Sequence, residues 1–165
     1  MVENDKKPAI RFKDFTEAWE QRKLDDLVNY QSSPLTTKDA TDNGKYILYD
    51  ANQAIGTTNT LNIEQDYITI IKDGAGVGRI RILPKNTAFI GTMGALIPNK
   101  NDLEFIFALL TNSDLNKKFS GSTIPHIYFK DYGKESYLVP ILSEQHVVGR
   151  LFKQIDHLIT LHLRN

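Results

Sequence analysis

The chain has 165 residues, of which 41% are hydrophobic and 24% are charged. This is the composition of an ordinary globular domain and excludes a disordered or low-complexity protein. The chain has no cysteine, which excludes a disulfide framework, a thiol nucleophile and a cysteine-ligated zinc site. Its 20 basic residues are balanced by 20 acidic ones, whereas nucleic-acid-binding domains usually have a basic excess.

The start of the chain has no apolar segment like that of a signal peptide, and no stretch approaches the length of an uncharged membrane span. We therefore expect a soluble, cytoplasmic protein without a membrane partner. Residues 1–8 are charged up to Pro8 and are expected to be flexible. Thr16 is placed to cap a short helix through Trp19, which is expected to run into a strand.

The middle of the chain predicts short strands between polar loops. A polar loop over residues 31–44 is followed by a strand at 46–49. The β-branched run 67–71 and the run 77–83 are joined by Asp73-Gly74, which is a tight-turn signal, and predict two further strands. In the second of these, arginines alternate with isoleucines and are expected to point outward. Short apolar runs follow at residues 88–90 and 95–97.

Helices are predicted in the second half of the chain. Asn101 or Asp102 is placed to cap a helix that contains residues 105–110, and Ser113 is placed to cap a shorter one through Phe119. Residues 124–132 are expected to be irregular or extended.

The final segment has the spacing of an amphipathic helix that begins at a Ser143 cap. Its candidate partner-binding residues recur at intervals of three and four: Val148, Leu151, Ile155 and Leu158. Together the elements predict an α+β (mixed α/β) fold with a short twisted sheet, a few helices and a projecting C-terminal helix. We expect a globular domain at residues 1–140 and a spacer or dimerisation helix at residues 141–165.

Three sequence blocks carry a family resemblance. They are FKDFTEAWEQRKL at residues 12–24, YITIIKDGAGVG at 67–78, and the pair Glu144-Gln145 followed by FKQID at 152–156. The segment GSTIPHI at 121–127 lies between the second and third blocks. In order and spacing, this chain resembles a target-recognition domain, with the start of its spacer helix, from the specificity subunit of a type I restriction-modification system. The resemblance covers nearly the whole chain.

The resemblance implies a non-catalytic component that binds double-stranded DNA and docks a modification methyltransferase subunit, with a restriction subunit in the larger complex. A complete subunit of that family has two recognition domains, which recognise the two halves of a split site. This chain has one, so it is either a fragment or a half subunit that pairs, with a homodimer through the final helix as one arrangement. The methyltransferase uses S-adenosylmethionine, whereas no cofactor is expected on this chain.

The glycine segment 74–78 is not a dinucleotide fingerprint, because Arg79 occupies the sixth position, where that motif needs glycine. It is interpreted as a tight connection that helps to present basic residues, although a purely conformational role is the simpler alternative. The candidate DNA-binding residues are polar or basic and lie in loops or on a strand face: Thr36, Thr37, Lys38, Lys45, Asn52, Thr58, Lys72, Arg79, Arg81, Ser122, Thr123, His126, Tyr128 and Lys130.

Each of these stretches has an alternative interpretation as an ordinary polar loop or a solvated strand face. His157 and His162 are five residues apart, a spacing that does not favour a metal site on a helix. The main competing function is a protein-interaction adaptor that uses the final helix and binds no DNA. A hydrolase with His126 as general base is a weaker third hypothesis, because no nucleophile motif accompanies this histidine.

Overall fold

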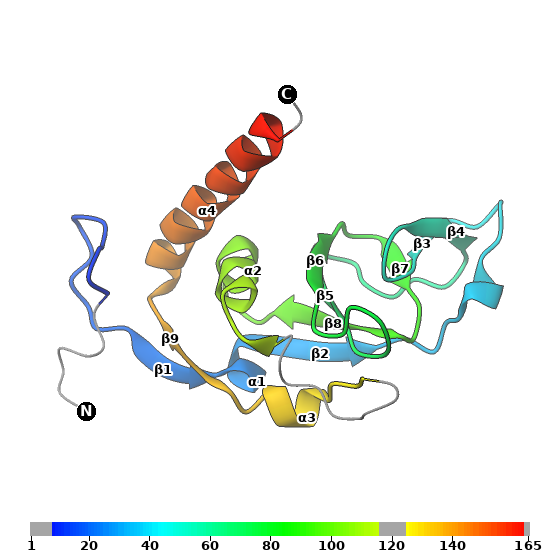
Figure 1. Cartoon of the computed structure of the whole chain (residues 1–165), viewed down its shortest axis with the longest axis horizontal. Helices are drawn as coiled ribbons and strands as arrows, with labels where there is room; N and C mark the ends of the chain where they lie inside the picture. Colours follow the sequence, from blue (N-terminus) through cyan, green and yellow to red (C-terminus); the bar gives the residue numbers. More distant parts are fainter. Residues whose placement is uncertain (1–7, 116–124, 164–165) are drawn as a thin grey trace.

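The computed structural model describes residues 8–115 and 125–163, and it shows a body of short strands and helices from which one long helix projects (Figure 1). The elements are β1 (Glu20–Lys23), α1 (Leu24–Leu27), β2 (Val28–Ser32), the 3₁₀ turn η2 (Thr37–Asp39), β3 (Tyr46–Tyr49), β4 (Ala54–Thr58), β5 (Tyr67–Ile71), β6 (Ile80–Leu83), β7 (Thr87–Phe89), β8 (Met93–Pro98), α2 (Leu103–Thr111), α3 (Phe129–Tyr132), β9 (Ser136–Val139) and α4 (Leu142–His162).

The central sheet has the order β2-β8-β5-β6, and all neighbouring strands in it are antiparallel. Every residue of β5 is buried. Because side chains alternate across a strand, Ile68 and Ile70 enter the core that contains α2, whereas Tyr67 and Ile71 enter a second core on the opposite face. Burial on both faces explains the nearly continuous apolar sequence of this strand.

The second core is closed by a three-stranded sheet of order β4-β3-β7, in which β3 pairs antiparallel with β4 and parallel with β7. Leu48 and Phe89 from this sheet pack in the same core as Tyr67. The Tyr67 hydroxyl lies 2.9 Å from that of Thr87, so its polar end is paired inside the core. Burial raises the pKa of Tyr67 to about 12.

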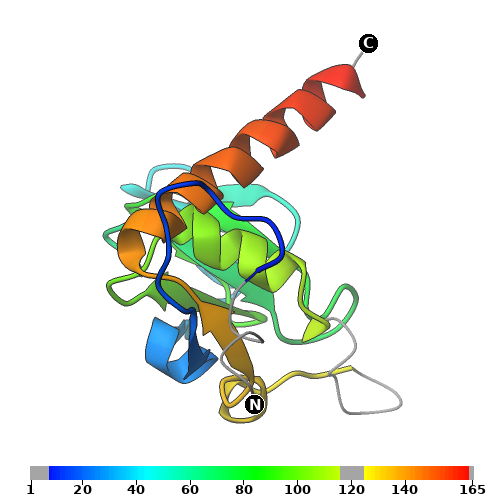
Figure 2. The same cartoon turned by 90° about the vertical axis from the view of Figure 1, so that its left-hand side faces the viewer.

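A separate antiparallel pair joins β1 to β9, with Glu20 opposite Val139 and Lys23 opposite Ser136. The two strands run side by side, and α4 follows β9 and extends away from the body (Figures 1 and 2). In the part of the chain that the structure describes, no helix is both long and apolar enough to cross a membrane.

The mixed α+β class is confirmed, and so is the Asp102 cap, whose side chain accepts a hydrogen bond from the Phe105 N–H. The predicted helix from Thr16 to Trp19 is wrong. The Thr16 N–H bonds to the Glu17 carboxylate, and the following residues pair with β9. The helical turn begins only at Leu24.

Two other local predictions need correction. Ser143 lies inside α4, whose N-cap is Ile141 and has no side-chain cap. Residues 129–132 form α3 where irregular or extended chain was expected. Residues 54–58 form β4, an element for which the sequence carried no strand prediction. Most of the second short helix predicted from Ser113 falls in residues 116–124, outside the described part of the chain.

Candidate nucleic-acid interface

One end of the central sheet carries several of the candidate residues. The Gly91 N–H bonds to the Leu35 carbonyl at 2.7 Å, and the Lys72 N–H bonds to the Thr92 carbonyl at 3.0 Å. The Ile127 N–H in turn bonds to the Lys72 carbonyl at 3.0 Å. These bonds join four connections into one continuous structure, which we call the loop row: residues 35–38, 91–92, 72–73 and 125–128.

The centre of the loop row is a cluster of polar and aromatic side chains. His126 Nδ1 forms an ion pair with the Asp73 carboxylate, and the backbones of the two residues form an isolated antiparallel bridge. The His126 ring lies 3.9 Å from the ring of Tyr128, over which the Lys130 ammonium lies at 5.1 Å. Tyr128 is 47% exposed, so this cluster presents an aromatic surface next to a positive charge.

The outer end of the loop row is the 3₁₀ turn η2. The Thr36 hydroxyl accepts from the Lys38 N–H, while the Asp39 carboxylate accepts from both the N–H and the hydroxyl of Thr36. The backbone hydrogen bond from Thr36, followed by the side-chain one, lowers the pKa of Asp39. Thr36, Thr37 and Lys38 are all exposed. Thr36 and Thr37 border a groove of about 280 Å³ whose other wall includes Gly91 and Thr92.

Asn52, Arg79 and Arg81 form a second group beside the first. The Arg79 guanidinium donates to the Ala51 carbonyl at 2.8 Å and to Asn52 Oδ1 at 2.7 Å. Arg81 donates to the carbonyls of Asp50 and Asn52 at 2.6 and 2.8 Å. Its guanidinium also lies 5.2 Å from the Tyr49 ring, and burial lowers its pKa. Both arginines are thus engaged by the turn that joins β3 to β4.

The remaining candidates are placed differently. Lys45 is exposed beside Tyr46, with its ammonium 5.2 Å from that ring. Thr58 is only 5% exposed and its hydroxyl accepts from the Thr60 N–H, so its side chain is not presented to a ligand. Ser122 and Thr123 lie outside the described residues.

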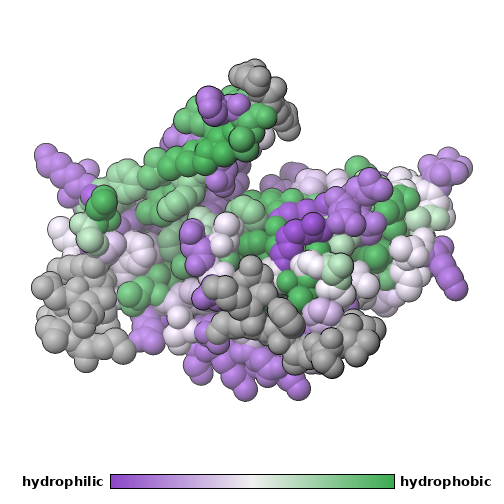
Figure 3. Space-filling view, viewed as in Figure 1, coloured by the Kyte–Doolittle hydropathy of each residue, from purple (hydrophilic) through white to green (hydrophobic). Residues whose placement is uncertain are grey.

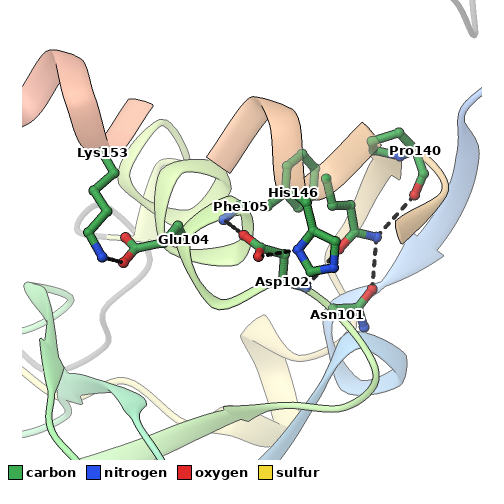
Figure 4. Close-up of polar contacts among 8 residues, drawn as sticks. Asn101, Asp102, Glu104, Phe105, Pro140, His146 and Lys153 are labelled. Carbon is green, nitrogen blue, oxygen red and sulfur yellow. Dashed lines mark hydrogen bonds and ion pairs between the residues drawn. The ribbon is translucent and has the colours of Figure 1, made fainter. Parts of the chain in front are cut away.

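A separate polar network fixes α4 to the start of α2 (Figure 4). Gln145 is 3% exposed. Its amide oxygen accepts from the Asp102 N–H, and its amide nitrogen donates to Asn101 Oδ1 and to the Pro140 carbonyl, each at 3.0 Å. His146 Nδ1, also on α4, lies 2.7 Å from the carboxylate oxygen Oδ2 of Asp102. The first turn of α4 is therefore part of the domain rather than a free extension.

Close approach of the two helices depends on Gly149, which is buried where α4 crosses the start of α2. A Cβ atom on Gly149 would lie 2.7 Å from the backbone nitrogen of Phe105 and would also overlap the Asp102 carboxylate. One turn further along, Lys153 pairs with Glu104 (Figure 4). Residue 149 thus has no room for a side chain.

The N-terminal arm lies against the other side of α4. Arg11 donates two hydrogen bonds to the Glu144 carboxylate, at 2.7 and 2.6 Å. Glu144 is fully buried, and a buried carboxylate is tolerated only when it is paired in this way. The Trp19 ring packs edge-on against Phe105 at 6.4 Å. The sequence placed Glu144 and Gln145 in a block of family resemblance but gave no sign of the Arg11–Glu144 pair or of the burial of Gln145, because charged and amide residues in a polar segment are usually exposed.

Beyond this joint, α4 exposes an apolar stripe, which forms the hydrophobic band along the helix in Figure 3. Of the four predicted partner-binding residues, Val148 packs against the core that contains α2. The other three are exposed, with Leu158 at 64%. The stripe consists of Leu151, Phe152, Ile155, Leu158 and Ile159. An exposed apolar surface of this kind is typical of a protein contact.

Comparison with solved structures shows the same fold in the S subunit of a type I restriction-modification system from M. genitalium. The TM-score is 0.72 at 21% identity, over 91% of this chain and 42% of that one. The HsdS subunit from Thermoanaerobacter tengcongensis gives 0.68 at 14%, over 92% and 41%. A structure that describes complex assembly and conformational transition of the type I R-M system gives 0.70 at 15%, over 92% and 42%. The chain thus spans about two fifths of the chains that it matches.

The family follows from the sequence. The model for the type I restriction modification DNA specificity domain matches residues 16–165, and the chain belongs to this family. The resemblance seen in the sequence blocks is thereby confirmed. Specificity domains of this kind serve DNA recognition and are not catalytic. A search of curated proteins gave no significant match.

Proposed function

We propose that this chain recognises one half of a bipartite DNA site through the loop row and the adjoining β3–β4 turn, and that α4 docks the modification methyltransferase subunit. In this proposal residues 1–140 are the recognition domain and 141–165 are the spacer helix. A restriction subunit joins the larger complex, and the second half-site is recognised by a second recognition domain, either in a longer chain or in a second copy.

The observation that carries the proposal is the topology of the central sheet. β2 ends, β8 begins, β5 ends and β6 begins at the same end of the sheet, because these strands are antiparallel. The connections that leave this end are the ones that carry most of the described candidates. In Figure 1 they lie to the right, whereas α4 leaves the body at the left. DNA and a protein partner would therefore occupy separate surfaces.

The chemistry of the loop row suits a duplex. Lys38 and Lys72 in the loop row, together with Lys130 in the adjoining α3, supply ammonium groups for phosphates, and Thr36 and Thr37 are exposed beside Lys38. Phosphate contacts of this kind position a protein on DNA, whereas polar side chains that enter a groove select the sequence. A neutral chain is compatible with this role, since binding depends on the charge of the contacting surface.

The test is selection of bound duplexes from a random library with the full chain and its methyltransferase partner, followed by a salt titration on an enriched duplex. We expect an enriched half-site, paired with a second one at fixed spacing, and affinity that falls steeply with salt because counterions are released. A competent complex that enriches no sequence would refute the proposal. Helix-dependent binding of a protein without any DNA binding would support the adaptor hypothesis instead.

A further inference from the structure

Two arginines bind the turn at residues 50–53: Arg79, which directly precedes β6, and Arg81 within β6. The backbone carbonyls of three successive residues, Asp50, Ala51 and Asn52, each accept a guanidinium hydrogen bond of 2.6 to 2.8 Å. These bonds join residues 28 to 31 positions apart and connect the three-stranded sheet to the central sheet. The position of the turn is therefore fixed relative to the loop row.

The turn does not need the arginines in order to close. Asp50 Oδ1 accepts from the N–H groups of Asn52 and Gln53, both at 2.7 Å. The Asp50 N–H bonds to the Gln53 carbonyl at 2.9 Å. Side-chain capping of this kind stabilises a turn locally. The guanidinium bonds consequently add placement and orientation to a turn that is already closed.

Arg79 also fixes the orientation of one side chain. A guanidinium has only donors, so the oxygen of the Asn52 amide faces Arg79, at 2.7 Å from Nη2. The amide nitrogen is directed to the other side, and Asn52 is exposed. An oriented N–H donor on a fixed turn matches the acceptors on base edges in the major groove, such as purine N7, guanine O6 and thymine O4.

The charge of this region favours the same ligand. The carbonyl oxygens that accept from the arginines carry no net charge and do not neutralise the two guanidinium groups. Residues 50–53 contribute one negative charge, that of Asp50, so the turn and its two arginines together are positive. Arg81 is partly buried beside Tyr49, whereas Arg79 is exposed. Hydrophilic side chains gather over β6 on the face shown in Figure 3. A positive, exposed turn of fixed geometry is suited to contact with DNA.

We propose that residues 50–53 form a specificity-determining turn in which Asn52 donates a hydrogen bond to a base acceptor. Arg79 and Arg81 then act as positioning residues for this turn, and not as the contacts that select the base. The inference rests on the proposed DNA-recognition function. It assigns roles within the group of Asn52, Arg79 and Arg81, which sequence reasoning treated alike.

The experiment compares sequence selection by the full chain, with its methyltransferase partner, for Asn52→Ala, Arg81→Lys and Arg79→Lys. Lysine keeps the positive charge but cannot bridge two acceptors as a planar guanidinium does. Arg81 is partly buried, so Arg81→Lys carries some risk of a folding defect. Arg79→Lys is included because Arg79 is exposed and its replacement carries less of that risk. Arg22→Lys is the matched control, because Arg22 also donates to a backbone carbonyl, that of Asp26 at 3.2 Å, but belongs to β1.

We expect all three turn variants to lose discrimination at the same base pair, within the roughly 5-fold to 150-fold that good base contacts supply. Affinity of the lysine variants for random duplex should stay within about twofold of the wild type, because phosphate attraction depends on charge. Full discrimination by the lysine variants would overturn the inference, as would loss at a different base pair from Asn52→Ala or an equal loss in Arg22→Lys. A wild-type complex without an enriched site refutes the proposed function itself.

Discussion

Replacement of Gly149 by alanine tests the joint between α2 and α4. The new methyl group would meet the Phe105 backbone nitrogen at 2.7 Å, together with the Asp102 carboxylate and the Glu104 side chain. Because the nearest atoms include backbone, the helices must separate. Overpacking of this kind costs about 1 to 3 kcal/mol, and separation also weakens the Asp102 cap, which contributes about 1 kcal/mol. Alanine recovers about 1 kcal/mol through its helix propensity.

The net expectation for Gly149→Ala is a loss of about 1 to 3 kcal/mol in the free energy of unfolding. At roughly 2 to 4 °C per kcal/mol for a protein of this size, Tm falls by about 2 to 12 °C. Urea denaturation and thermal melting followed by circular dichroism measure both quantities. Ser143→Ala is the matched control, because Ser143 is exposed on the same helix. A Gly149→Ala protein as stable as the wild type would refute the close approach described for this joint.

The other predictions concern charge, pH and docking. Lys72→Ala should reduce the slope of log affinity against log salt by about 0.9 on any duplex, because one phosphate contact is lost. Asp39 has a lowered pKa, so its contribution to the η2 turn is present above its ordinary value of 3.8 and is lost as pH falls through the lower folded value. The Thr36 amide resonance should report this transition, and Asp39→Asn should remove it. Leu158→Glu should weaken methyltransferase binding at least tenfold, about 1.4 kcal/mol, by placing a charge in an apolar contact.

Each of these outcomes has a contrary result. An unchanged salt slope in Lys72→Ala would remove Lys72 from the interface, and Lys134→Ala, on the exposed segment after α3, supplies the comparison. A Thr36 resonance that moves identically in Asp39→Asn would show that another group titrates there. Retention of methyltransferase binding by Leu158→Glu would show that the apolar stripe serves a different contact. DNA binding by this variant alone should match the wild type.

The parts of the fold that sequence predicted are those with strong local signals. β5 combines β-branched residues with burial on both faces, and Asp102 stands directly before the apolar turn of α2. By contrast, β1 has the sequence EQRK and is mostly exposed. Its strand conformation comes from pairing with β9, a partner more than a hundred residues away that no local pattern indicates. Tertiary pairing overrode propensity at this strand.

In the candidate site, too, local sequence signals predicted some features, whereas tertiary contacts determined others. The polar character of the loops predicted which segments carry candidate side chains, because exposed loops follow from turn residues. Alternation placed Arg79 and Arg81 on one face, yet the atoms that they bind belong to a turn 27 to 31 residues earlier. Similarly, Thr58 is a polar residue of a kind common in loops, but it belongs to β4, pairs with β3 and is buried. Such contacts depend on how the two sheets pack and are set by the whole fold.

The β1–β9 pair has a mechanical consequence. The chain enters the body of sheets and helices through β1 and leaves it through β9, and these two strands form one ribbon at the foot of α4. The segment between β1 and β9 therefore begins and ends at the same two-stranded ribbon. A torque applied along α4 therefore reaches the domain through a double-stranded connection and the Gln145 joint, not through a swivelling linker. The direction in which the loop row faces is thereby coupled to the rotation of α4 about its own axis.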